Sequence, residues 1–467
     1  EVLKGIEVPA AKAILSFFDR WEPEKTLENE LVTSCAGELL GKANMVFRFN
    51  GKFIHEIPQL AAAWQAHYGE TAKERGQCLI TGALDAIPNT HPLIKGVQGA
   101  QSSGAALVSF NASAFCSYNK EQNQNAPVGK YAAFAYTAAL NHLLADRKNV
   151  HRIGDAAVVC WAENADKQYE EFAADLFFGD GDGDQSDEQR LSALQASVEL
   201  LAKGLPCREL DLDPERKFYI LGISPNAARL AVRFFYCDSF GNIVKNIKAH
   251  YDRLEIVRPS YDKYPMLPLW KLLSATVNPS AKDKTPNSAM AGAVARAVFS
   301  GGRYPASLLE CTFLRIRAER EITRERAAII KAYYLRNPNE KCPKEVLTVS
   351  LNKDSKNVPY TLGRLFSVYE EIQQAANPGI NTTIKDKYFG SAATMPATVF
   401  PILSSLAQKH LRKLSDAQRV YLDKKVMTLK SVLGEQYPAH MSLPEQGSFD
   451  LGYYHQTQAR YTKKEDK

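Results

Sequence analysis

Residues 218–236 read FYILGISPNAARLAVRFFY and carry the clearest strand pattern in this chain of 467 residues. Apolar, aromatic and β-branched residues fill 218–223 and 229–236, and turn-forming residues separate the two runs. This order predicts a β-hairpin. Alternation along the second run places Leu230, Val232 and Phe234 on one face, which we expect to pack in the core. A further buried strand is expected over 155–161.

Helical patterns lie on both sides of this hairpin. Apolar spacing predicts helices before it, over 9–21, 58–68 and about 128–144. Strand patterns stop after about residue 266, and further helices are expected from there on at 286–300, 305–319, 321–336, 359–376, 397–414, 415–433 and 447–462. A capping-box spacing at Ser415–Gln418 predicts the start of one of them.

The expected fold class is therefore α+β. A mixed N-terminal region with a short β-sheet and the hairpin is followed by an all-α C-terminal helical bundle. We divide the chain into an α+β region at 1–265, a basic helical region at 266–345 and a C-terminal bundle at 346–467.

The composition is that of an ordinary globular protein, with 45% hydrophobic and 24% charged residues. The net charge of +6 permits nucleic-acid binding without requiring it. The cysteines show no local zinc spacing, since the nearest two are Cys207 and Cys237. Charges interrupt the N-terminal segment and no apolar run approaches the roughly 20 residues of a membrane span. We therefore expect a cytoplasmic protein with no membrane partner.

The richest candidate binding segment is residues 93–131, LIKGVQGAQSSGAALVSFNASAFCSYNKEQNQNAPVGKY, which we call the polar block. Neutral hydroxyls and amides crowd it, and these groups both donate and accept hydrogen bonds, as the reading of base edges requires. A short strand is expected at 105–110. The alternative is a Ser/Asn-rich loop whose side chains only cap its own turns.

A second candidate is the basic stretch from Arg296 to Arg364, which holds fourteen Lys or Arg against seven Asp or Glu. Arg317, Arg320 and Arg324 have the spacing of one helical face, with Arg315 beside them. Guanidinium groups bind phosphate in a bidentate manner, so this face suits a nucleic-acid backbone. The alternative is a solvated face whose arginines pair with neighbouring glutamates.

Motifs for catalysis are missing from the sequence. It contains no HExxH, no phosphate-binding GxxxxGK[ST] loop and no GxSxG. The tract Asp180–Asp184 resembles a calcium loop but has Gln185 and Leu191 where such a loop needs glycine and glutamate. We therefore expect no metal, no cofactor and no catalytic residue.

Three stretches carry a family resemblance. The patterns GAQSSGAALVSFNASAFCSY with NAPVGKYAAFAYTAALNHLL, FYILGISPNAARLAVRFF and GYYHQTQ resemble the large subunit of the type I-C CRISPR Cascade surveillance complex. The chain opens on Glu1 without a methionine, so we interpret it as a piece that lacks a leading segment.

The resemblance implies a non-enzymatic DNA-recognition subunit. It implies recognition of the protospacer-adjacent motif in double-stranded DNA, promotion of strand separation, and stabilisation of the R-loop. The implied partners are the target duplex and displaced strand, a CRISPR RNA complex with backbone, RNA-processing and small subunits, and a recruited helicase-nuclease. The C-terminal bundle is similar to the separate small subunits of such complexes.

The resemblance also assigns residues. Those implied for the duplex and adjacent motif are Lys95, Gln101, Ser102, Ser103, Ser109, Asn111, Asn125 and Lys130. Those implied for DNA backbone are Arg315, Arg317, Arg320, Arg324, Lys409, Arg412 and Lys413. For Tyr453–Gln458, stacking on single-stranded bases and packing between helices are both open.

One functional alternative belongs to a different class. The chain could be a metal-dependent nuclease or a nucleotide-dependent DNA-processing enzyme with a dispersed active site. Cleavage of DNA by the purified chain with magnesium alone would favour it.

Overall fold

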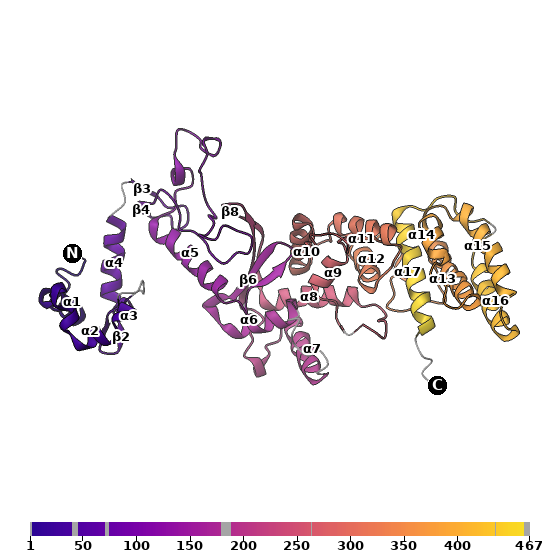
Figure 1. Cartoon of the computed structure of the whole chain (residues 1–467), viewed down its shortest axis with the longest axis horizontal. Helices are drawn as coiled ribbons and strands as arrows, with labels where there is room; N and C mark the ends of the chain where they lie inside the picture. The colour runs from indigo at the N-terminus through magenta and orange to yellow at the C-terminus, as the bar shows by residue number, and fades with distance from the viewer. Residues whose placement is uncertain are drawn as a thin grey trace. The chain divides into compact units, whose positions relative to one another are not determined.

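The computed structural model describes residues 2–39, 45–70, 74–178, 188–262, 264–434 and 436–461 (Figure 1). The chain forms two compact units. Unit 1 comprises 1–96, 100–145 and 227–229, and unit 2 comprises 97–99, 146–226 and 230–467. The three regions expected from the sequence have other boundaries than these two units, and that division stays a prediction. The tract Asp180–Asp184 lies outside the described residues.

Unit 1 consists of helices and short strands joined by loops. They are α1 (Pro9–Arg20), α2 (Glu30–Ser34), α3 (Ala36–Leu39), β1 (Arg48–Phe49), β2 (Lys52–Phe53), α4 (Pro58–Glu70), β3 (Glu74–Gln77), β4 (Leu84–Ile87) and α5 (Lys130–Ala145). Strands β1 and β2 form one antiparallel pair and β3 and β4 another. The buried apolar clusters are small: Ala10, Ala11 and Leu60 form one of them.

Unit 2 contains a four-stranded sheet in the order β5-β6-β7-β8. The strands are β5 (His151–Ile153), β6 (Ala156–Ala162), β7 (Lys217–Asn226) and β8 (Arg229–Ser239). The pairing of β6 with β7 is antiparallel and places Val158 opposite Gly222. The predicted buried strand and hairpin are thus confirmed.

The hairpin differs from its prediction in two details. Both strands extend further than expected, so that only Ala227 and Ala228 join them, with Ala227 at φ 53°. Leu230 and Phe234 are buried as predicted, but Val232 is 51% exposed. The prediction for Val232 was wrong: it lies between two buried positions of β8, but the core does not cover its own side chain.

Helices make up the rest of unit 2. They are α6 (Lys167–Ala173), α7 (Glu188–Ala202), α8 (Phe240–Leu254), α9 (Leu269–Ser274), α10 (Ser288–Ser300), α11 (Ala306–Glu319), α12 (Arg324–Arg336), α13 (Val358–Ala376), α14 (Ile384–Thr394), α15 (Pro396–Leu411), α16 (Asp416–Lys430) and α17 (Leu443–Tyr461). The sequence did not predict α6, α7, α8, α9 or α14. The α+β class, with strands in the N-terminal half and helices beyond them, is confirmed.

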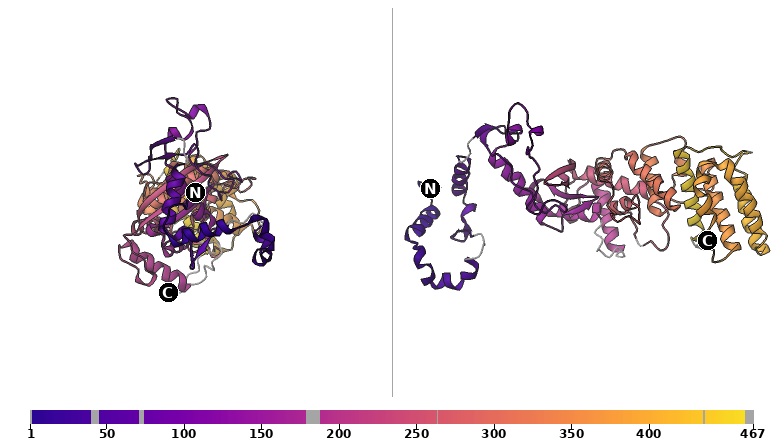
Figure 2. Two further views of the ribbon diagram at one scale, coloured as in Figure 1. Left: turned by 90° about the vertical axis from the view of Figure 1, so that its left-hand side faces the viewer. Right: turned by 45° about the horizontal axis from the view of Figure 1, so that its top comes forward.

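Helices α13 and α17 lie side by side in the C-terminal part of unit 2 (Figures 1 and 2). Glycine permits their close approach. A Cβ added to Gly363 would lie 1.9 Å from the carbonyl oxygen of Phe449, and one added to Gly452 would lie 2.1 Å from that of Tyr360. The two backbones therefore leave no room for a side chain at either position.

Candidate nucleic-acid interface

The polar block follows β4 and ends at the first turn of α5. The strand predicted at 105–110 was wrong: the segment makes only isolated bridges, from Ala105 to Ile94 and from Ala106 to Arg229. The first bridge has two backbone hydrogen bonds, at 2.9 and 2.8 Å. The block is thus a set of loops held by a few backbone hydrogen bonds. Binding residues concentrate in loops of this kind.

Three residues form an exposed turn before this bridge. The side chains of Gln101, Ser102 and Ser103 are exposed, and the turn is closed by a bond of 2.9 Å from the backbone N–H of Gly104 to the carbonyl of Gln101. Gly104 has φ 110°, and a Cβ there would lie 2.8 Å from Cβ of Leu93. Glycine is therefore required to hold this turn.

Asn125 plays a different part from the one implied by the resemblance. Its Oδ1 accepts a bond of 3.0 Å from the backbone N–H of Ser117, and its Nδ2 donates to the carbonyls of Lys120 at 3.1 Å and Gln122 at 3.0 Å. These bonds fold the loop 117–125 onto itself. In this structure Asn125 positions the loop rather than presenting its amide outward.

His91 and Asn123 brace the loop from inside, and both are buried. His91 Nε2 lies 2.8 Å from Asn123 Oδ1, while His91 Nδ1 lies 2.5 Å from the hydroxyl of Tyr136 on α5. An amide oxygen only accepts, so Nε2 carries the proton and Tyr136 donates to Nδ1. Burial lowers the pKa of His91 below its ordinary value, although the bond to Asn123 opposes this. The ring is therefore neutral, and hydrogen bonds at both of its nitrogens fix its position.

Asn111 is exposed and its amide oxygen accepts a hydrogen bond from Arg229. The guanidinium of Arg229 also lies over the ring of Phe115, 4.1 Å from its centroid. Ser109, two residues before, is half-buried. Asn111 is accordingly part of a small polar cluster that brings a positive charge to the polar block, a charge that sequence reasoning missed.

The two lysines assigned to phosphates are in different settings. Lys95 has an exposed side chain, and its backbone N–H donates to Asn141 Oδ1 at 2.7 Å. Lys130 is half-buried, and its Nζ donates to the carbonyl of Tyr68 at 3.0 Å and lies 4.5 Å from the centre of that ring. Lys95 is the freer of the two to meet a phosphate.

The single arginine face expected from the sequence is not formed. Helix α11 ends at Glu319, Arg320 takes a left-handed conformation at φ 55°, and α12 begins at Arg324. Arg317 and Arg320 are exposed, and Arg317 donates to Gln446 Oε1 at 2.8 Å. Arg315 is half-buried, and its Nη1 lies 3.6 Å from Oε1 of Glu319.

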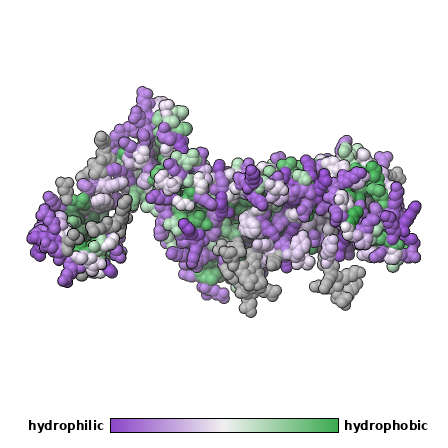
Figure 3. All heavy atoms as spheres, in the orientation of Figure 1, coloured by the Kyte–Doolittle hydropathy of each residue, from purple (hydrophilic) through white to green (hydrophobic). Residues whose placement is uncertain are grey.

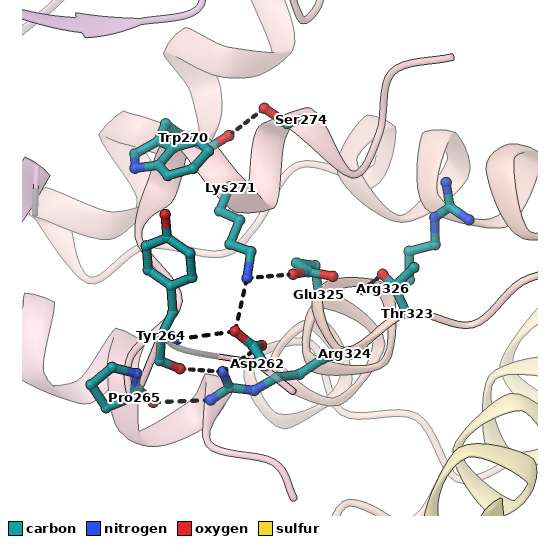
Figure 4. A network of polar contacts seen from close by, with 10 residues as sticks. All are labelled: Asp262, Tyr264, Pro265, Trp270, Lys271, Ser274, Thr323, Arg324, Glu325 and Arg326. Atoms are coloured by element: carbon teal, nitrogen blue, oxygen red, sulfur yellow. Dashed lines mark hydrogen bonds and ion pairs between the residues drawn. The ribbon is translucent and has the colours of Figure 1, made fainter. Parts of the chain in front are cut away.

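Arg324 is occupied inside the protein (Figure 4). It is 7% exposed, and its guanidinium donates to Asp262 at 3.0 Å and to the carbonyls of Tyr264 and Pro265. Burial opposes ionisation of Asp262, but hydrogen bonds from the Tyr264 N–H, Arg324 and Lys271 hold the pKa of its carboxyl below the ordinary value. The geometry therefore gives Arg324 a structural role and offers no phosphate contact.

Lys409, Arg412 and Lys413 all carry exposed side chains near the end of α15. Lys413 Nζ lies 3.4 Å from Asn377 Oδ1. Three cations within five residues fit a nucleic-acid backbone, and they form a candidate surface of unit 2.

The aromatic segment of α17 is used for packing. Tyr453, Tyr454 and His455 are buried, and the hydroxyl of Tyr453 donates to Glu370 at 2.6 Å while that of Tyr454 donates to the Val257 carbonyl at 2.7 Å. Of the two interpretations left open by the sequence, the structure supports packing between helices.

Within the described ranges, no group of three His, Cys, Asp or Glu side chains is placed to hold a metal ion. In the same part of the chain, each helix is too short or too polar to cross a membrane.

The model of a family described as CRISPR-associated protein (Cas_Csd1) matches residues 1–461. No curated protein matches the chain.

Proposed function

The chain belongs to the Cas_Csd1 family of CRISPR-associated proteins, which is the family of the type I-C large subunit, and we propose that it recognises the protospacer-adjacent motif in duplex DNA through the polar block. Members of this family are Cascade subunits and generally non-catalytic. In the proposal this chain too has no catalytic role. It starts strand separation, holds the R-loop and offers a docking surface to the helicase-nuclease.

The observation that carries the proposal is the exposed turn at Gln101–Ser103. Its amide and hydroxyl groups have both donors and acceptors, which suit the mixed pattern at base edges. The loops around it are braced from inside by Asn125 and by the chain from Tyr136 through His91 to Asn123. A braced loop loses little conformational entropy when it binds, so the exposed groups can contribute to affinity.

Charge near the turn supports the same assignment. Lys95 is exposed six residues before Gln101, and Arg229 reaches Asn111 from β8. In Figure 3 the loops of this part of unit 1 show purple hydrophilic residues mixed with paler and green ones. A surface of neutral hydrogen-bonding groups with a few cations fits reading of a short motif beside phosphates.

The remaining assignments rest on the exposure of basic side chains in unit 2. Arg317, Arg320, Lys409, Arg412 and Lys413 would contact the backbone of the displaced strand, since all five are exposed. The proposed partners are the guide-RNA complex with its backbone, RNA-processing and small subunits, acting in the cytoplasm. Target sequence would be read by pairing with the guide, and the protein would read only the flank.

The test compares two DNA targets in the assembled complex. A variant with Gln101→Ala and Ser103→Ala should bind cognate duplex roughly tenfold more weakly, since a good base contact contributes about 1–3 kcal/mol. Binding to a target with a pre-opened bubble should stay nearly unchanged, because strand separation is no longer needed. Ser280→Ala, an exposed serine of unit 2, is the matched control. Equal loss on both targets would rule out a duplex-reading role.

The alternative of a dispersed nuclease or nucleotide-dependent enzyme has its own test. The purified chain would be incubated with DNA and magnesium, with and without a nucleotide. Cleavage without any partner protein would support the alternative and contradict the proposed role.

A further inference from the structure

A pocket of about 270 Å³ opens within the polar block of unit 1. Three segments line it: residues 89–93 after β4, residues 106–110, and the short helix Gln122–Asn125. Its innermost side chains are His91 and Asn123, which are 5% and 3% exposed. Because these two are fixed by hydrogen bonds at both ends, the base of the pocket is preformed.

The chemistry of the lining is uncharged. Leu93, Val108 and Phe110 supply apolar surface, while Asn89, Thr90, Ser109 and Gln122 supply hydroxyls and amides. His91 is held neutral, with Nε2–H bonded to Asn123 and Nδ1 bonded to Tyr136. Such a lining does not suit a phosphate, a carboxylate or a metal ion, which need charged partners or several anionic ligands. It suits a flat, neutral molecule with polar edges.

The volume of the pocket further limits which ligands fit it. Pockets for drug-sized ligands span about 300–1,000 Å³, so a pocket of 270 Å³ lies just under the smallest of them. A single heteroaromatic ring system fits this description better than a complete nucleotide. A nucleobase has apolar faces for Leu93 and Phe110 and a hydrogen-bonding edge for amides and hydroxyls.

We propose that this pocket captures one unstacked base of the displaced DNA strand. The inference rests on the proposed function, which brings a DNA duplex to the adjacent turn at Gln101–Ser103. When the strands separate, bases of the target strand pair with the guide, whereas those of the displaced strand lose their partners. A base without a partner costs least to extrude, so the displaced strand is its source. Holding one such base opposes re-annealing of the duplex beside the polar block.

The experiment uses 2-aminopurine, a fluorescent adenine analogue, at successive positions of the displaced strand in the assembled complex. One position near the adjacent motif should show a fluorescence change that its neighbours do not. Ala106→Leu fills the pocket and should abolish that change, and should weaken R-loop binding roughly tenfold, as expected for the loss of one buried, stacked base. Ala114→Leu, an exposed alanine of the same block outside the pocket, is the matched control.

The outcomes separate this inference from the proposed function. If the fluorescence pattern is the same in Ala106→Leu and in the unchanged protein, base capture is refuted while duplex reading stands. If the complex fails to bind cognate duplex at all, base capture and duplex reading are both refuted. Should Ala106→Leu fail to fold, Asn89→Ala with Gln122→Ala removes exposed polar groups at the rim instead. A position-specific signal that survives this second variant unchanged also refutes the pocket.

Discussion

At the scale of single residues, the polar block divides into groups that hold the loops and groups that face outward. Composition alone could not separate them, because Asn125 and Gln101 offer the same amide chemistry. The difference comes from neighbours: Asn125 satisfies three backbone groups of its own loop, whereas the side chain of Gln101 is exposed. Internal hydrogen bonds therefore decide which amides remain for a ligand.

Asn125→Ala should loosen the loop 117–125. Three backbone groups would lose their partner, and a typical intramolecular hydrogen bond contributes about 1 kcal/mol to stability. Hydrogen–deuterium exchange should accelerate at Ser117 and its neighbours, with no change in unit 2, and duplex binding should weaken. Ser113→Ala, at an exposed serine of the same block, is the control and should leave exchange as it was. Unchanged exchange in Asn125→Ala would show that the loop is held by other contacts.

At the scale of elements, the sequence predicted the strand pair and most helices but not the breaks that place the arginines. A spacing of three and seven residues puts Arg317, Arg320 and Arg324 on one face only if the helix is continuous. The left-handed Arg320 ends that continuity, and the N-cap Thr323 accepts the N–H of Arg326 at 3.4 Å to start a new helix. Helix α8 was missed although Asp238 and Ser239 are typical helix-start residues, because β8 runs directly into Phe240 with no loop between the two elements.

Arg324→Ala should reduce stability and leave the salt dependence of DNA binding alone. Removing it takes from Asp262, whose side chain is 7% exposed, one of its two cationic partners and leaves Lys271, and a hydrogen bond to a charged group contributes about 1.5–3 kcal/mol. Urea unfolding measures this loss. Arg320→Ala, at an exposed arginine four residues earlier, should change stability by less than about 0.5 kcal/mol. If Arg320 contacts a phosphate, that variant should lower the salt slope by about one. If instead Arg324→Ala lowered the salt slope and left the stability unchanged, Arg324 would belong to the DNA interface.

Gly452→Ala should force α13 and α17 apart. The added methyl group would overlap the Tyr360 carbonyl, and overpacking of this kind costs about 1–3 kcal/mol or more. Gly390→Ala is the matched control, because Gly390 is also inside a helix, α14, but has open space around its Cβ position. That variant should be stabilised by about 0.5–1 kcal/mol. Equal thermal stability of the two variants would contradict the close helix contact.

At the scale of the whole molecule, buried neutral histidines should make the protein sensitive to acid. Burial lowers the pKa of His250 and of His455 to about 3, helped by the nearby Arg253 and Lys331 respectively. Each ring contacts a tyrosine hydroxyl, Tyr304 at 2.6 Å and Tyr360 at 2.9 Å. Both are in unit 2, and the buried His91 of unit 1 is shifted in the same direction.

The direction in which stability changes with pH follows from proton uptake by the unfolded chain. The folded pKa values lie below the unfolded value of about 6.5, so the unfolded chain binds more protons as the pH falls below 6.5. The stability from neutral histidine is present above that pH and is lost below it, by about 2 kcal/mol for each of His250 and His455 between pH 6.5 and 5. The free energy of unfolding at the two pH values measures this. His455→Gln should remove its share, and His142→Gln, at an exposed histidine, should not.

Asp450 acts in the opposite direction. Its carboxyl is buried, and burial raises its pKa well above the ordinary value although Arg317 opposes this. A raised pKa favours the folded state at low pH and costs stability as the pH rises, so Asp450 offsets part of the histidine effect. Neither the two histidines nor Asp450 could be identified as buried from the sequence, because their burial depends on how α8, α12, α13 and α17 pack.

The central claim is that the polar block contacts duplex DNA beside the target. The most direct measurement places a photoreactive amino acid at Ser102, in the exposed turn, and irradiates the complex on cognate duplex. The prediction is a covalent adduct to the flanking duplex at the adjacent motif, with no such adduct from the same group at Ala417 on α16. Crosslinks from Ser102 to protein alone, with none to DNA, would contradict the account.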